Sequence, residues 1–240
     1  MTKIEWTDES LNPFWGCTHG CTYCQARRIA HMRAERIGRL RGYPADVIAK
    51  MKRFEPVWLP DADSILATIH KFKKPKTIFM GFMGDIAYQK YKNILNILKI
   101  ASEHPEHRFL FLTKNAKIYR DPLIHWKISK NIWMGYSDDS RKNNRGWLCF
   151  YGIDQTFFSY EPLLGEIKTF NPYLTKWIII GALTDRRGQP VPAEKGGTRL
   201  EWVMPIIEVA DKHNIPVFLK NNLLKLYPEL PMRQEFPWKK

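Results

Sequence analysis

The chain has 240 residues and a formal net charge of +14, with 38 Lys and Arg against 24 Asp and Glu. This length suits one large α/β domain, and a hydrophobic content of 44% is enough to bury a core. No run of about 18 apolar residues occurs, so we expect no transmembrane helix and no membrane partner. The N-terminus lacks the pattern of a signal peptide, and the four cysteines do not form a secreted disulfide framework, so we expect a cytoplasmic protein.

Before residue 77 the pattern is mainly helical. Residues 4–15 contain a short extended piece that ends in the turn signal Asn12-Pro13, and 25–41 is predicted as a helix broken at 42–44. Residues 45–54 and 63–72 also carry helical spacing of apolar positions.

From residue 77 onward, short apolar strands alternate with helices. The expected strands are 77–80, 108–112, 131–136, 156–160, 177–180 and 216–219, and the expected helices are 91–102, 118–128, 141–151 and 199–213. The strands are apolar throughout, as in parallel sheets that are covered on both faces. We therefore predict an α/β fold, a partial (β/α)6–7 TIM-like barrel of parallel strands. A single domain would span residues 1–240, with an irregular Pro-rich surface tail at 227–240.

Positive charge is concentrated directly after position 24. The segment 25–53 holds nine basic residues against two acidic ones, which is half of the net charge of the chain. The basic residues are Arg27, Arg28, Arg33, Arg36, Arg39, Arg41, Lys50, Lys52 and Arg53. This favours a surface for the phosphates of a nucleic acid or nucleotide. The alternative is a solvated helix face that aids solubility.

Three cysteines, Cys17, Cys21 and Cys24, fall within eight positions in the spacing C-x-x-x-C-x-x-C. Thiolates are soft ligands that favour zinc, copper(I) or iron–sulfur clusters. Three thiolates leave one iron of a four-iron cubane open to another ligand. Zinc, with His19 as a fourth ligand, is the main alternative, and a loop without metal is the other.

With Tyr23 as the aromatic residue before the third cysteine, the motif resembles the signature of the radical S-adenosylmethionine (radical SAM) superfamily. The resemblance implies a [4Fe-4S] cluster whose open iron chelates S-adenosylmethionine. It also implies that an external electron donor reduces the cluster and that a 5′-deoxyadenosyl radical removes a hydrogen atom from the substrate. The fold that it implies is the same partial barrel.

Polar or small residues follow the predicted strands and, together with Tyr23 of the cysteine motif, are the cofactor-binding candidates. Gly84 and Asp85 resemble the segment that binds the amino group of S-adenosylmethionine, although the superfamily has Glu and adjacent glycines there. Lys114 would pair with the carboxylate of S-adenosylmethionine or with a substrate phosphate, Ser137 would bind the ribose, and the strand before Gly181 would stack on adenine. A turn, a surface lysine, a helix cap and core packing are the ordinary alternatives.

Five further residues are candidates for contact with the substrate or for catalysis. They are Glu161, Lys220, Asp138, Arg27 and Cys149. Glu161 can instead pair with a nearby cation, and Cys149 is either a hydrogen donor to a product radical or a small core residue. Because the carboxyl ends of parallel strands meet at one rim of a barrel, we expect these side chains to share a pocket.

A longer set of segments resembles a phage-associated family of radical SAM-like proteins. The segments are 4–7, 12–13, the cysteine loop with Arg27, 84–85, 112–114, 134–137, 159–165, 180–181 and 216–220. The resemblance runs nearly end to end and extends more distantly to spore photoproduct lyase, which repairs a thymine dimer in DNA. Phage relatives are associated with hypermodified thymine, made by radical rearrangement of an amino-acid adduct on the base.

These resemblances imply a radical SAM enzyme, of isomerase or lyase type, that acts on a base of a nucleic acid. The substrate that they favour is modified thymidine in phage DNA, reached in the cytoplasm of the host. A repair lyase is the alternative within the same chemistry. A zinc-stabilised protein that binds nucleic acid without catalysis is the alternative from another class.

Overall fold

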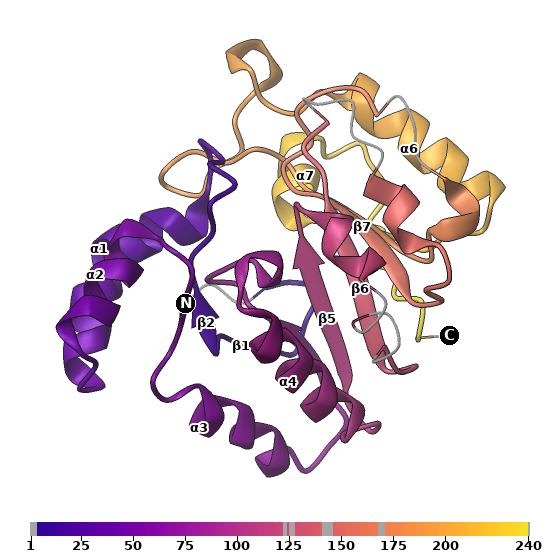
Figure 1. The fold of residues 1–240 in the computed structure, drawn as a ribbon. Helices are drawn as coiled ribbons and strands as arrows, with labels where there is room; N and C mark the ends of the chain where they lie inside the picture. Colours follow the sequence, from indigo (N-terminus) through magenta and orange to yellow (C-terminus); the bar gives the residue numbers. More distant parts are fainter. Residues whose placement is uncertain (1–3, 122–123, 125–127, 141–145, 168–170, 240) are drawn as a thin grey trace. The chain divides into compact units, whose positions relative to one another are not determined.

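The computed structural model of the chain describes residues 4–121, 124, 128–140, 146–167 and 171–239 (Figure 1). The chain divides into two compact units. The first comprises Met1–Lys114 and Asp121–Trp133, and the second comprises Asn115–Arg120 and Met134–Lys240. The prediction of a single domain over the whole chain stays a prediction.

Seven strands follow one another in the main sheet in the order β1-β4-β5-β6-β7-β8-β9. Their bounds are β1 (Glu9–Leu11), β4 (Thr77–Met80), β5 (Arg108–Thr113), β6 (Ile132–Ser137), β7 (Thr156–Tyr160), β8 (Ile178–Ile180) and β9 (Val217–Leu219). The pairings β1–β4, β4–β5, β6–β7, β7–β8 and β8–β9 are parallel. Every residue of β4, β6, β7, β8 and β9 is buried, as the apolar runs predict. The predicted fold class, α/β with the parallel strands of a partial barrel, is confirmed.

In its described residues, the first unit also contains a two-stranded antiparallel sheet and the α-helices α1 to α4. The sheet pairs β2 (Phe14–Trp15) with β3 (Val57–Trp58). The helices are α1 (Gln25–Leu40), α2 (Ala45–Arg53), α3 (Ala62–Ala67) and α4 (Tyr91–Ser102), and 3-10 turns occur at η1 (Thr68–Lys71) and η2 (Ile86–Tyr88). The predicted helix at 63–72 is therefore α3 followed by the tighter turn η1. Helix α4 buries Ile94, Ile97, Leu98 and Ala101, which share one face.

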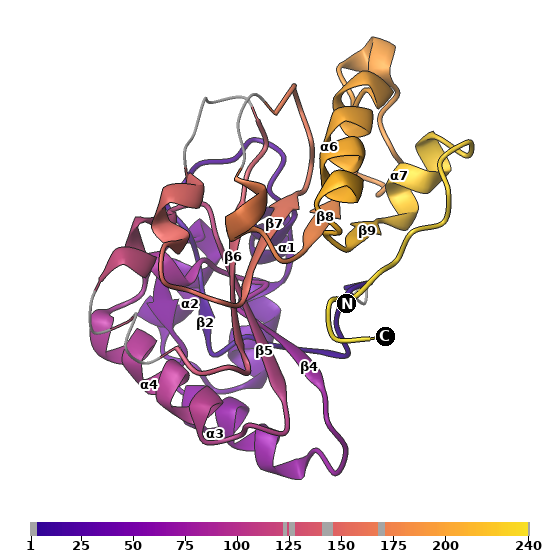
Figure 2. The ribbon, with the colours of Figure 1, turned by 90° about the vertical axis from the view of Figure 1, so that its right-hand side faces the viewer.

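The second unit contains α6 (Leu200–Lys212) and α7 (Asn221–Leu226), which lie beside β8 and β9 (Figure 2). Short 3-10 turns occur at η3 (Ala116–Arg120), η4 (Gly146–Phe150), η5 (Pro172–Leu174) and η6 (Ala193–Lys195). Of the helix predicted at 118–128, residues 118–120 belong to the 3-10 turn η3 and Ile124 is helical. Of the helix predicted at 141–151, residues 146–150 form the 3-10 turn η4, and 122–123, 125–127 and 141–145 lie outside the described residues. Pro122 explains part of this difference, because the residue before a proline disfavours the helical conformation.

The C-terminal tail belongs to the packing of the second unit. No helix or strand occurs in the described residues 227–239, in line with the prediction of an irregular tail. The tail is nevertheless paired with β9, since the N–H of Leu219 donates to the carbonyl of Arg233 at 2.7 Å and the N–H of Glu235 donates to that of Val217 at 3.1 Å. Trp238 then packs on Trp177, with ring centroids 5.1 Å apart. The tail thereby covers an edge of the sheet, which the expectation of a surface segment did not include.

Candidate functional site

The loop that carries the three cysteines is fixed to the segment that follows β4. The N–H of Gly16 donates to the carbonyl of Met83 at 2.9 Å, and the N–H of Asp85 donates to the carbonyl of Gly16 at 3.2 Å. The N–H of Cys17 donates to the carbonyl of Phe54 at the end of α2, at 3.0 Å. The start of the loop is thus held at the carboxyl end of β4, which is the edge at which parallel barrels build their sites.

The end of the loop is fixed by the start of α1. Cys24 is the N-cap of α1, and its Sγ accepts a hydrogen bond from the N–H of Arg27 at 3.3 Å. Cys17, Cys21 and Cys24 are all partly buried. Both ends of the eight-residue cysteine motif are therefore held by backbone hydrogen bonds within the first unit.

Burial favours the protonated form of the Cys17 and Cys24 thiols. Burial, followed by the nearby Asp85 carboxylate and the other two thiols, raises the pKa of Cys17 to about 12, although the N–H of His19 donates to its Sγ at 3.3 Å. Burial also raises the pKa of Cys24, against the N–H of Arg27. A bound metal deprotonates a coordinating thiol, so ligation would reverse this preference.

Thiolates are the ligands that an iron–sulfur cluster uses, but the described residues do not form a site for a single metal ion. Among them, no group of three or more His, Cys, Asp or Glu is arranged to hold a metal ion. The three partly buried thiols on this loop are ligands of the type that an iron–sulfur cluster uses. The assignment of the cysteines stays a prediction.

The Asp85 carboxylate joins the ends of β4 and β5. It is 7% exposed and accepts hydrogen bonds from the hydroxyl of Thr113 at 2.6 Å, the N–H of Lys114 at 3.0 Å and the N–H of Ala87 at 3.0 Å. Burial raises the pKa of Asp85, and these three donors oppose that shift. Asp85 therefore has protein partners for both oxygens, and its predicted contact with S-adenosylmethionine stays a prediction.

Gly84 and Lys114 lie against the cysteine loop. A Cβ atom at Gly84 would lie 2.9 Å from Cδ2 of Phe14 and 3.0 Å from the carbonyl oxygen of Gly16, so a side chain there would push the loop away. The Nζ of Lys114 lies 5.7 Å from the ring centroid of Tyr23, within the range of a cation–π contact. Lys114 thus brings a positive charge to the loop that holds the thiols.

The first unit adds residues that the sequence did not single out. Burial raises the pKa of Tyr88, and the Asp85 carboxylate adds to the shift. Thr113 is a second example, because it donates to Asp85. Arg27, a predicted substrate contact, has its guanidinium 5.6 Å from the ring centroid of Phe54. The sequence signal that could have identified Tyr88 is its position three residues after Asp85.

In the second unit, three predicted residues come together. The Nζ of Lys220, directly after β9, lies 2.5 Å from Oε1 of Glu161, directly after β7. The hydroxyl of Ser159 donates to the other oxygen of Glu161 at 2.8 Å. A Cβ atom at Gly181, directly after β8, would lie 3.0 Å from Cδ of Lys220 and 3.3 Å from Cγ of Glu161. Gly181 therefore leaves the space that this ion pair occupies.

The remaining candidates are placed separately in the second unit. Ser137 ends β6 and is 8% exposed. The N–H of Asp138 donates to the carbonyl of Ser159 at 3.0 Å, and its carboxylate accepts from the N–H of Ser140 at 2.8 Å. Cys149 lies in η4 with 8% exposure, and burial raises the pKa of its thiol. A pocket shared by all the predicted residues stays a prediction.

Comparison with known proteins gives a family. The profile of a family described as "Protein of unknown function (DUF5131)" matches residues 1–223. The chain belongs to this family. No curated protein matches the chain.

A solved structure of spore photoproduct lyase, complexed with dinucleoside spore photoproduct, is similar to the DUF5131 chain with a TM-score of 0.49 and 12% sequence identity. The match covers 93% of this chain and 62% of the chain of that protein. The DUF5131 chain therefore spans less than two thirds of the length of that enzyme, and a likeness at this level does not transfer its activity.

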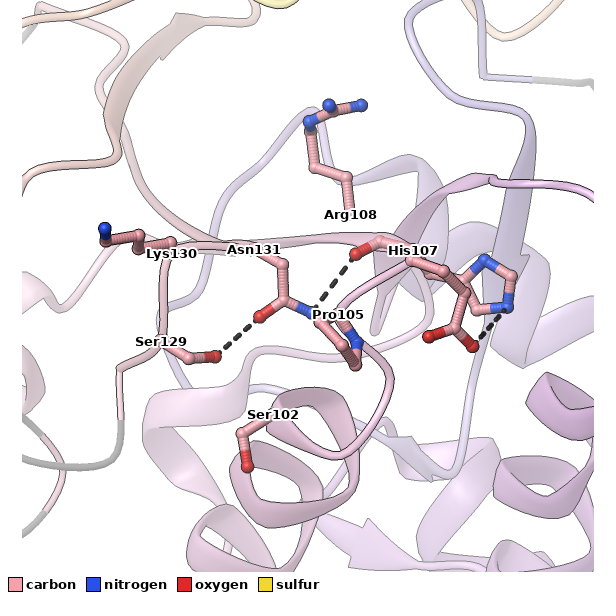
Figure 3. Close-up of a pocket in the computed structure, with 8 residues that line it drawn as sticks. Ser102, Pro105, His107, Arg108, Ser129, Lys130 and Asn131 are labelled. Atoms are coloured by element: carbon pink, nitrogen blue, oxygen red, sulfur yellow. Dashed lines mark hydrogen bonds and ion pairs between the residues drawn. The ribbon is translucent and has the colours of Figure 1, made fainter.

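The described residues of the DUF5131 chain also form a pocket of about 420 Å³ at the start of β5 and β6 (Figure 3). It is lined by Ser102, Pro105, Glu106, His107, Arg108, Ser129, Lys130 and Asn131. Because parallel strands start at this edge, the pocket lies at the edge opposite to the one where sites are expected.

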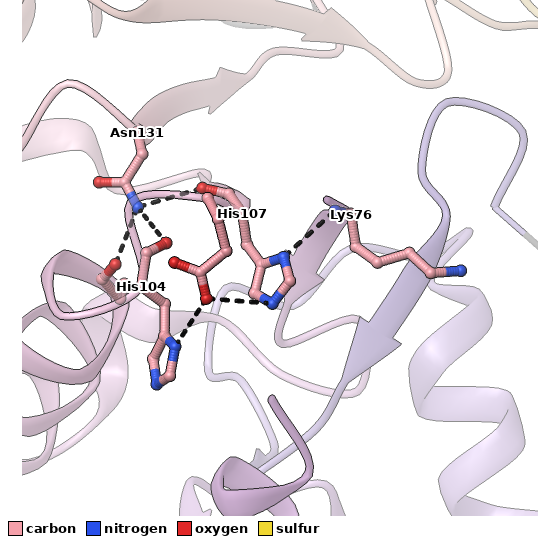
Figure 4. Close-up of polar contacts among 6 residues, drawn as sticks. Lys76, His104, His107 and Asn131 are labelled. Carbon is pink, nitrogen blue, oxygen red and sulfur yellow. Dashed lines mark hydrogen bonds and ion pairs between the residues drawn. The ribbon is translucent and has the colours of Figure 1, made fainter. Parts of the chain in front are cut away.

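The polar groups around this pocket bond to one another (Figure 4). The amide nitrogen of Asn131 donates to the carbonyls of Ala101, His104 and His107 at 2.8, 3.0 and 3.1 Å. The N–H of Lys76 donates to Nδ1 of His107 at 3.2 Å. These bonds satisfy the carbonyls at the end of α4, so they support the fold. Within the described residues, no helix has the length and apolar character needed to cross a membrane.

Proposed function

We propose that this DUF5131 chain is a radical SAM enzyme that modifies a base of a nucleic acid. The observation that carries the proposal is the cysteine loop. Cys17, Cys21 and Cys24 lie on one loop that is held at both ends, at the carboxyl end of β4. Lys114 extends over Tyr23, directly before the third cysteine of that loop.

The three cysteines would hold a [4Fe-4S] cluster through their thiolates. When bound, the cluster and S-adenosylmethionine together supply a 5′-deoxyadenosyl radical that takes a hydrogen atom from the substrate, after an external donor has provided an electron. Lys114 supplies a positive charge for the carboxylate of S-adenosylmethionine. Asp85 keeps Lys114 in place by accepting its backbone N–H at 3.0 Å.

The second unit contributes the residues proposed for the rest of the cofactor and for the substrate. Ser137 and the strand before Gly181 would bind the ribose and adenine. Glu161 and Lys220, which form an ion pair at 2.5 Å, would contact the substrate together with Asp138. Cys149, buried at 8% exposure, would donate a hydrogen atom to a product radical.

The substrate that we favour is modified thymidine in phage DNA, and the reaction is rearrangement of an amino-acid adduct on the base. The net charge of +14 supports a nucleic-acid substrate. An enzyme that reacts with a base must extrude it from the duplex or accept single strands. A lyase that repairs a thymine dimer would use the same cofactors, and the product of the reaction separates the two.

The test of the cofactor uses Cys21→Ala, with His19→Ala as the matched control in the same loop. After anaerobic reconstitution we expect about four iron atoms per chain and the absorption of an iron–sulfur cluster. Reduced protein should cleave S-adenosylmethionine to 5′-deoxyadenosine, Cys21→Ala should lose both properties, and His19→Ala should keep them. Colourless protein that holds zinc, or cleavage by Cys21→Ala, would contradict the proposal.

The test of the substrate uses DNA with deuterium in the modified thymine. Deuterium should appear in 5′-deoxyadenosine. Mass spectrometry of the nucleosides should then show a rearranged base whose mass is unchanged apart from the label. Cleavage of S-adenosylmethionine without such transfer would retain the radical chemistry and remove thymine as the substrate.

A further inference from the structure

Helix α1 buries small residues, and most of its long residues are exposed. Its buried positions are Ala26, Ala30, Ala34 and Gly38, which recur every four residues. A Cβ atom at Gly38 would lie 2.5 Å from Cγ1 of Ile48, so α2 packs closely against this side of α1. Ile29 and Ile37, which are partly buried, also pack against this core, whereas the arginines of α1 after Arg28 are exposed.

The opposite side of α1, which we call the outer face, consists of Met32, Arg33, Arg36, Arg39 and Leu40. All five are exposed, and residues three and four positions apart on a helix lie next to one another. The face begins about two turns after the cysteine loop, since Cys24 is the N-cap of the helix. It therefore lies on the element that leads directly out of the proposed cluster site.

Two of these arginines carry charge that no acid of the described residues offsets. Glu35, the single acidic residue of α1, lies 2.6 Å from Nη2 of Arg39 and 3.3 Å from Nζ of Lys52. Within the described part of the chain, no carboxylate forms an ion pair with Arg33 or Arg36. Two exposed guanidinium groups without an ion-pair partner among the described residues are available to an external anion.

We propose that the outer face of α1 binds the phosphate backbone of a nucleic acid through Arg33 and Arg36. Guanidinium groups recognise phosphate oxygens in a bidentate manner, and their spacing of about 4.5 Å along the axis lets both act on one strand. The apolar residues Met32 and Leu40 are two turns apart and form no continuous stripe, which disfavours insertion into a membrane surface. A strand held here would run toward the cysteine loop.

This inference deepens the proposed function and rests on it for the nature of the substrate, but the binding itself requires neither cluster nor S-adenosylmethionine. The test compares Arg33→Ala/Arg36→Ala with Arg186→Ala/Arg187→Ala, which removes two exposed arginines from a turn of the second unit. Binding of labelled single-stranded and duplex DNA is followed by fluorescence anisotropy at about 50 to 300 mM KCl.

The wild-type affinity should fall linearly with the logarithm of salt concentration, and Arg33→Ala/Arg36→Ala should weaken it about tenfold and reduce the slope by about 2. The control pair should keep the wild-type slope. Arg33→Lys/Arg36→Lys should have most of the wild-type slope, because lysine retains the charge. Circular dichroism checks that each variant is folded.

Equal loss in both alanine pairs, no binding of DNA by the wild type, or binding of phosphatidylserine vesicles in place of DNA would overturn the inference. The two proposals fail separately. Salt-dependent DNA binding through Arg33 and Arg36 without cleavage of S-adenosylmethionine would leave this inference standing and refute the proposed function. Base modification by a double variant with wild-type affinity would do the reverse.

Discussion

The buried carboxylate of Asp85 connects neighbouring segments at the carboxyl end of a parallel strand. Its donors come from β5 and from η2, so it ties the segment after β4 to both. By holding the backbone of Lys114, it orients a side chain whose Nζ lies over Tyr23. At the residue scale, Asp85 is therefore a positioning residue that acts on the cysteine loop through Lys114.

Tyr43 shows a second buried polar group with a clear energetic role. Its hydroxyl donates to the carboxylate of Asp61, and a guanidinium N–H of Arg41 donates to the Tyr43 oxygen at 3.2 Å and to Asp61 at 2.9 Å. Burial, followed by the bond to Asp61, raises the pKa of Tyr43 from 10.0 to about 12. The bonds connect the turn after α1 to the start of α3.

We predict that Tyr43→Phe lowers the free energy of unfolding by about 1 kcal/mol at neutral pH, because the bond to Asp61 is lost. The folded pKa lies above the unfolded one, so the stability that the neutral phenol contributes is present below pH 10 and is lost as the pH rises through about 12. In urea denaturation, the difference between wild type and variant should therefore shrink across that window.

Tyr151→Phe is the control for this experiment, since Tyr151 is 60% exposed. It should match the wild type at neutral pH. A Tyr43→Phe curve that stays parallel to the wild-type curve through alkaline pH would show that the phenol does not titrate as described.

At the scale of elements, the cysteine loop depends on two glycines for different reasons. Gly16 has φ +90° and Gly20 has φ +82°, both in the left-handed region. A Cβ atom at Gly16 would lie 2.0 Å from the carbonyl oxygen of Glu55, whereas nothing lies within 4 Å of one at Gly20. The backbone of Glu55 thus leaves room only for glycine at the start of the loop.

We predict that Gly20→Ala costs about 1 kcal/mol through its backbone conformation alone. Gly16→Ala should cost about 3 to 5 kcal/mol, because the backbone at Glu55 must also move. Urea denaturation measures both changes, and the iron content after reconstitution shows whether the loop still holds a cluster. Equal costs for the two variants would mean that the loop is not pressed against Glu55.

At the scale of the whole molecule, the dominant electrostatic feature is the net charge of +14. The ion pairs of α1 and α2 involve side chains that are about half exposed or more, such as Arg39 with Glu35 at 75% and 49%. Exposed pairs of this kind contribute little to stability. We therefore expect repulsion among the excess cations to outweigh these pairs and to destabilise the compact state.

We predict that the melting temperature rises by a few degrees as NaCl increases to about 0.3 M, because salt screens this repulsion. Differential scanning fluorimetry measures the effect. In Arg33→Glu/Arg36→Glu, each replacement lowers the net charge by two, from +14 to +10, so the dependence on salt should be weaker. A melting temperature that falls with added salt would show that the ion pairs matter more than the repulsion.

The sequence by itself determined the elements whose pattern is local. The apolar runs of β4 and β8 are buried at every position, and the parallel pairing that they predicted is observed. The small buried residues of α1 and the apolar face of α4 likewise follow from helical periodicity. The spacing of the cysteines predicted three thiols on one loop, because residues this close in sequence stay close in the folded chain.

Only the tertiary structure decided which groups meet. Asp85 finds Thr113 on another strand, and Glu161 finds Lys220 two strands away. A side chain has no room at Gly84 because a loop lies close to it, and none at Gly181 because an ion pair lies close to it. These outcomes depend on strand register and on the packing of segments distant in sequence, which local patterns do not encode. For the same reason, the docking of the tail through Trp238 on Trp177 became visible only in the folded chain.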